Sequence, residues 1–115
     1  MLRDETLLLD MLLAARDAIG FVAAIDEAQF EDSKLHQNAV IRSIEIIGEA
    51  AGKVSRAFQQ VHPEFPGMAI IGMRHRLIHD YNEVRLDLVW DVARNRLPEL
   101  ITALQVLVPP PDDEG

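Results

Sequence analysis

The spacing of apolar residues most constrains this fold, because apolar side chains recur every three or four positions along most of the chain. That spacing places them on one face of an α-helix. Two long stripes show it, at Leu8, Leu12, Ala15, Ile19 and Val22, and at Val40, Ile44, Ile47, Ala51 and Val54. No segment alternates with a period of two over a useful length, so the pattern predicts an all-α protein.

The pattern predicts four helices, over about residues 4–25, 34–57, 68–79 and 87–107. The polar segment 26–33 is expected to be a connection, in which Asp32 or Ser33 caps the second helix. Asp87 is placed to cap the fourth helix, and Pro98 should kink that helix or divide it. We therefore expect an up-and-down bundle of four or five helices.

The chain has 115 residues, which suits one helical domain over 1–108 and an acidic, proline-rich tail over 109–115. It contains no cysteine, which excludes disulfides and cysteine-based zinc sites. No apolar stretch reaches the roughly 20 residues of a membrane span, and no signal-peptide pattern is present. We therefore expect a cytoplasmic protein that does not associate with membranes.

The charge is unevenly distributed. The net charge of −8 argues against a broad nucleic-acid-binding surface, whose affinity comes mainly from lysine and arginine. Residues 67–96 are the exception, with 5 basic and 4 acidic side chains. This distribution favours a local anion site or a partner of matching charge.

The densest cluster of functional side chains lies in residues 74–81, with two arginines, two histidines, an aspartate and a tyrosine. One interpretation is a solvated helix end whose cations complement the helix dipole. A metal site is a second, because His75 and His79 are four apart and share a helix face. However, no third ligand is close in sequence, so we expect neither a metal nor another cofactor.

RNA cleavage without a metal is the third interpretation of this cluster. RNA supplies its own nucleophile, the 2′-hydroxyl, so an enzyme needs a base, an acid and a cation. Histidine suits both proton transfers because its pKa lies near neutrality. Arginine suits the phosphorane because its planar fork binds two oxygens and stays charged. The cluster supplies both residue types.

Residues 72–81 resemble the signature of the HepT-like toxins, which belong to the HEPN superfamily of α-helical domains. Arg74 and His79 match the Arg-x4-His motif of these proteins, and Tyr81 completes the form Arg-x4-His-x-Tyr. His75 stands where the family usually has another polar residue, often asparagine.

The resemblance extends beyond the motif. Residues 39–50 resemble the second-helix segment of the family, and residues 89–91 and 97–100 resemble its last helix. The similarity therefore covers roughly residues 1–108.

The resemblance implies a toxin that is a metal-independent endoribonuclease, with Arg74, His79 and His75 as catalytic residues. It implies an RNA substrate and, as partner, a cognate MntA-like nucleotidyltransferase antitoxin. In such pairs the antitoxin transfers AMP to the motif tyrosine, here Tyr81. The alternative is a non-catalytic HEPN module that binds a nucleotide or a partner protein.

Other polar residues are candidates for supporting roles. Arg76, Arg42 and Glu49 are expected to contact RNA phosphate or to set the geometry of the site. If Arg42, Glu45 and Glu49 face the bundle, they would pair with Arg74 or Arg76 and set the geometry of the site. The alternative is that these three residues form an exposed charged face.

Two further expectations concern packing. The two interior glycines of the second predicted helix, Gly48 and Gly52, predict a place where another helix packs closely. The wide apolar stripes predict a homodimer, which would bring two copies of the motif into one cleft.

Overall fold

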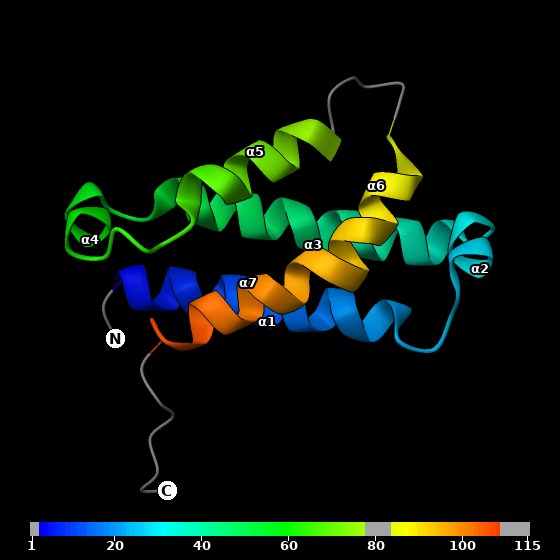
Figure 1. The fold of residues 1–115 in the computed structure, drawn as a ribbon, viewed down its shortest axis with the longest axis horizontal. Coiled ribbons are helices and arrows are strands. Elements are labelled where there is room, and N and C mark those ends of the chain that lie inside the picture. Colours follow the sequence, from blue (N-terminus) through cyan, green and yellow to red (C-terminus); the bar gives the residue numbers. More distant parts are fainter. Residues whose placement is uncertain (1–2, 78–83, 109–115) are drawn as a thin grey trace, which may run out of the picture.

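The computed structural model describes residues 3–77 and 84–108, and this part of the chain is helical with short connections (Figure 1). The elements are α1 (Arg3–Val22), α2 (Glu27–Glu31), α3 (Lys34–Lys53), α4 (Arg56–Val61), α5 (Gly67–Leu77), α6 (Leu86–Asp91), the π-helix η1 (Val92–Arg96) and α7 (Leu97–Gln105). The predicted all-α class is confirmed.

Two long antiparallel helices, α1 and α3, form the centre of the bundle (Figure 1). α7 packs on α1, and α5 packs on α3. The short helices α2 and α4 lie at opposite ends of the bundle (Figure 1). The apolar stripes of α1, α3 and α7 meet in one core, so the predicted stripe residues of α1 and α3 are nearly all buried.

Residues 26–33 are not the simple connection that their polarity predicted. Asp26 caps α2, because its carboxylate accepts the Gln29 N–H at 2.8 Å while the Gln29 side chain accepts the Asp26 N–H at 2.9 Å. Phe30 anchors this short helix; it is fully buried, and its ring centroid lies 5.4 Å from that of Trp90. The reciprocal cap and one buried aromatic ring outweigh the polar composition.

The second predicted helix, over 34–57, is also interrupted. Its start is as expected, because the Ser33 side chain accepts the His36 N–H at 3.2 Å and caps α3. However, α3 ends at Lys53, and Val54 has extended backbone. Ser55 then caps a separate helix, α4, by accepting the Phe58 N–H at 3.0 Å.

The prediction that Asp87 caps the fourth helix is wrong. The helix begins one residue earlier, and Arg85 occupies its N-cap position. The Asp87 carboxylate instead accepts two hydrogen bonds from the Arg85 guanidinium, at 3.0 and 2.8 Å. These bonds hold the pKa of Asp87 below its usual value.

Pro98 divides the last predicted helix, as expected, through the π-turn η1. Proline lacks an N–H, and in an α-helix its ring would clash with the carbonyl four residues earlier. In η1 the Leu97 N–H bonds instead to the Val92 carbonyl, five residues back. The wider turn accommodates the proline, and α7 continues directly from η1.

Two predicted features lie outside the described residues: the last part of the third predicted helix beyond Leu77, and the tail at 109–115. Among the described helices, none is both long enough and apolar enough to cross a membrane.

Candidate active site

The basic side chains of the predicted motif occupy the last turn of α5. Arg74, His75 and Arg76 follow one another there. Cations near a helix C-terminus interact favourably with the helix dipole, so this placement is electrostatically stable without any ligand. The three residues nevertheless differ in their surroundings, because His75 and Arg76 are exposed whereas Arg74 is half-buried.

Arg74 lies against the backbone of α3. Its aliphatic stem occupies the space above Gly48, where a side-chain carbon would overlap the Arg74 Cδ atom and lie 3.3 Å from Cβ and Cγ. The close helix packing predicted at Gly48 is therefore confirmed, and the contact is with the first residue of the motif. At Gly52 the prediction is wrong, because this glycine is exposed and an added side-chain carbon would meet nothing within 4 Å. The Arg74 Nε atom is buried and has no hydrogen-bond partner among the residues that the structure describes.

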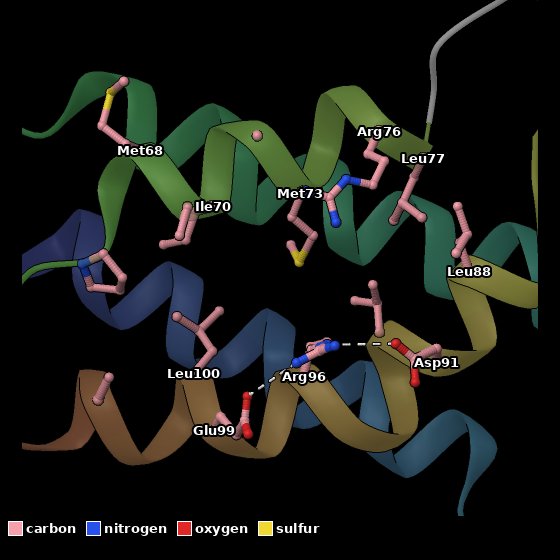
Figure 2. A pocket seen from close by; sticks show the side chains of 15 residues that line it. Met68, Ile70, Met73, Arg76, Leu77, Leu88, Asp91, Arg96, Glu99 and Leu100 are labelled. Atoms are coloured by element: carbon pink, nitrogen blue, oxygen red, sulfur yellow. Dashed lines mark ion pairs between the residues drawn. The ribbon is translucent and has the colours of Figure 1, made fainter.

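A groove of about 710 Å³ separates α5 from α6, η1 and α7 (Figure 2). Its floor is apolar and includes Ile70, Met73, Leu77, Leu88, Val92 and Leu100. Arg76 and Arg96 enter it from opposite walls, one from α5 and the other from η1 (Figure 2). Asp91 and Glu99 also line it, so two cations and two carboxylates surround an apolar centre.

The π-turn sets the position of Arg96. Its Nε lies 3.5 Å from an Asp91 carboxylate oxygen, and its Nη1 lies 4.0 Å from Glu99. The same Asp91 accepts a hydrogen bond of 2.7 Å from Asn95. In an ideal α-helix, residues five apart diverge by about 140°. The i→i+5 bonding of η1 instead brings Asp91 and Arg96 together.

Comparison with known proteins agrees with this architecture. The family model described as Ribonuclease HepT-like matches residues 11–107. The chain therefore belongs to the HepT-like ribonuclease family. The match covers most of the domain, so the family suggested by residues 72–81 is supported well beyond that segment.

Three relatives illustrate the relationship. A candidate RNase of Methanocaldococcus jannaschii is 32% identical over 103 residues, covering 90% of this chain and 94% of the relative. A second from the same organism is 35% identical over 96 residues, covering 84% and 83%. A Thermococcus cleftensis protein named Probable ribonuclease HepT is 40% identical over 77 residues, covering 64% and 70%. No solved structure matches significantly.

The described residues of this HepT-like protein contain one half of its motif. Arg74, His75 and Arg76 lie at the end of α5, and of the three only Arg76 lines the groove. His79 and Tyr81, the other predicted site residues, lie outside the described residues. Within the described ranges, no three histidine, aspartate or glutamate side chains gather where they could hold a metal ion.

The supporting roles expected on α3 are only partly compatible with the structure. Arg42 forms ion pairs with Glu45 at 3.6 Å and Glu49 at 3.3 Å. The three side chains therefore pair with one another rather than with Arg74 or Arg76, on a surface where Arg42 is 63% exposed. An exposed pair of this kind contributes little to stability. A role for Arg42 or Glu49 in contacting RNA stays a prediction.

Arg96 and Asp91 were not predicted as site residues from the sequence, although both line the groove. Their spacing of five places them on different faces of an α-helix, so periodicity gives no reason to pair them. The only available signal was Pro98, which predicted a disturbance of the helix at this point but not its form.

Proposed function

We propose that this HepT-like protein is a metal-independent endoribonuclease and the toxin of a toxin–antitoxin pair. Its family membership and the RNase names of its relatives support this proposal. The observation that carries it furthest is the packing of Arg74. The aliphatic stem of this permanently charged side chain packs against α3 at the end of α5, five positions before His79 in the sequence. A fixed cation of this kind suits a reaction that builds negative charge on phosphorus.

In the proposed reaction, the RNA 2′-oxygen attacks the adjacent phosphorus and the bond to the 5′-oxygen breaks. One of His79 and His75 accepts the proton of the 2′-hydroxyl, and the other donates a proton to the leaving 5′-oxygen. Arg74 stabilises the phosphorane, and Arg76 binds a neighbouring phosphate. The products are a 2′,3′-cyclic phosphate and a 5′-hydroxyl.

The groove supports the proposal that the protein acts as a homodimer. Its apolar floor and its balanced pairs of cations and carboxylates suit a protein surface better than the uniformly negative backbone of RNA. In a two-fold interface, an arginine of one copy meets a carboxylate of the other, and the converse pair follows by symmetry. Such an interface also concentrates two sets of α5 cations, which an acidic chain needs to bind RNA.

A nucleotidyltransferase antitoxin is the second partner that we propose. It would act on Tyr81, whose phenol oxygen attacks the α-phosphorus of ATP, loses its proton and displaces pyrophosphate. The AMP group adds an anion and bulk to the motif, so it competes with RNA phosphate for Arg74 and Arg76. This would silence the enzyme.

RNA cleavage by the purified chain tests the proposed activity. With a labelled RNA in EDTA, we expect cleavage that leaves 2′,3′-cyclic phosphate ends. Arg74→Ala and His79→Ala should each lower kcat/KM by at least ~100-fold, the usual scale for a positioned acid, base or cation. His75→Ala should cause a smaller loss.

Arg16→Ala is the matched control, because it removes the same charge from an exposed position on α1 and should retain activity. Circular dichroism should show that each variant is folded. A requirement for magnesium, or full activity of either Arg74→Ala or His79→Ala, would contradict the mechanism. Binding of RNA without cleavage by the unmodified chain would favour the non-catalytic alternative.

A further inference from the structure

Gly48 has an unusual position in this bundle. It is buried in the interior of α3, where glycine is less favourable than alanine. It is also the glycine at which an added side-chain carbon would overlap the Arg74 Cδ atom. By contrast, Gly52 lies one turn further along the same helix, and a carbon added there would meet nothing within 4 Å. The missing side chain therefore matters at one position of α3 and not at the next.

The orientation of Arg74 depends on this contact, because the residues that the structure describes provide no hydrogen bond or ion pair to its guanidinium. Within residues 3–77 and 84–108, no ion pair involves Arg74, and its buried Nε donor is unpaired. A buried donor without an acceptor is unfavourable, so hydrogen bonding does not account for this conformation. The stem is instead held by van der Waals contact with α3.

We propose that Gly48 is a positioning residue for Arg74: the space left by its missing side chain holds the arginine stem and so directs the guanidinium towards the RNA phosphate. The functional half of this inference rests on the proposed ribonuclease activity. The packing half does not, because it concerns only the contact between α3 and α5. Gly48 itself touches no reacting group.

The test compares Gly48→Ala with Gly52→Ala, each made in the wild type and in Arg74→Ala. Alanine is the better helix former, so Gly52→Ala should raise Tm by up to ~4 °C and leave cleavage unchanged. Gly48→Ala should lack that gain, because its methyl group displaces Arg74. In the Arg74→Ala background the overlapping Cδ atom is gone and only the 3.3 Å approach to the Cβ atom remains. Gly48→Ala should therefore raise Tm there, by less than Gly52→Ala does.

Cleavage kinetics supply the functional readout. Gly48→Ala should lower kcat at least ~10-fold with little change in KM, because a misdirected guanidinium weakens contact with the transition state more than ground-state binding. It should also cause no further loss of activity in Arg74→Ala, whereas two independent effects would multiply.

These measurements test the packing contact and the positioning role of Gly48 separately. If Gly48→Ala fails to fold, Arg74→Ala must restore folding; if the double variant also fails, the packing inference is overturned. Equal Tm gains from both alanine substitutions would overturn it as well. Full activity of a folded Gly48→Ala would overturn the positioning role. If the Tm coupling appears but the wild type cleaves no RNA, the contact stands and the proposed function fails.

Discussion

The Ser55 side chain joins two helices, α1 and α4, so Ser55→Ala is expected to destabilise the bundle. The Ser55 hydroxyl donates a 2.6 Å hydrogen bond to the Asp4 carboxylate, 51 positions earlier on α1. It also accepts the Phe58 N–H at 3.0 Å and so caps α4. The Ser55 N–H adds a 2.9 Å bond to Asp4, which alanine would retain.

The two lost interactions give the magnitude. Removing an N-cap serine costs about 1 kcal/mol. Losing a hydrogen bond to a charged, partly buried carboxylate costs about 1–2 kcal/mol more. We therefore expect Ser55→Ala to lower the free energy of unfolding by about 2–3 kcal/mol, or Tm by roughly 10 °C for a domain of this size.

The same contact predicts a pH dependence. The side-chain and backbone hydrogen bonds from Ser55 hold the pKa of Asp4 below its ordinary value of 3.8. A carboxyl with a lowered pKa stabilises the fold above its unfolded pKa, and this stability is lost as the pH falls through the folded pKa. Below about pH 4, therefore, the wild type should lose stability more steeply than Ser55→Ala, which keeps only the backbone bond.

Thermal unfolding followed by circular dichroism, from pH 7 down to pH 2.5, measures both effects. Ser33→Ala is the matched control, because Ser33 also caps a helix but is not bonded to a carboxylate in any hydrogen bond of the described residues. It should cost about 1 kcal/mol and leave the acid slope unchanged. Equal costs for the two substitutions, together with parallel pH profiles, would refute this account of Asp4.

Two further predictions concern the partners. Light scattering should show a dimer at micromolar concentration, and a wild-type monomer would count against the proposed interface. Met68→Glu should give a monomer, because it places a charge on an 85% exposed residue of the groove. Leu35→Glu is the control: it changes a 77% exposed residue at the start of α3 and should leave the dimer intact. Incubation with a cognate nucleotidyltransferase and ATP should add AMP to the wild type, visible by intact-mass spectrometry, while Tyr81→Phe should gain no adduct at this position and should keep its RNase activity. Silencing of the wild type without a gain of mass would mean that the partner inhibits by covering the site.

Much of this architecture is determined by local sequence. The three- and four-residue spacing of apolar side chains predicts the long helices α1 and α3, and both are present with their stripes buried. Ser33 at the start of α3 and Pro98 at the division of the last helix act through their immediate neighbours along the chain. The cluster at residues 74–81 is equally visible, because all its members lie within eight positions.

Contacts between distant segments decided the rest. α3 ends at Lys53, and Ser55 then bonds to Asp4 in the first turn of α1, 51 positions earlier. Helical periodicity contains no information about that partner. Arg96 reaches the groove because a π-turn changes the register of its helix. The contact between Gly48 and Arg74 likewise exists only because α5 packs on α3. The sequence alone determines which residues could form a site, since chemistry and helical period are local properties. Their orientation depends on how the helices pack, because a side chain is held by whichever element lies against it.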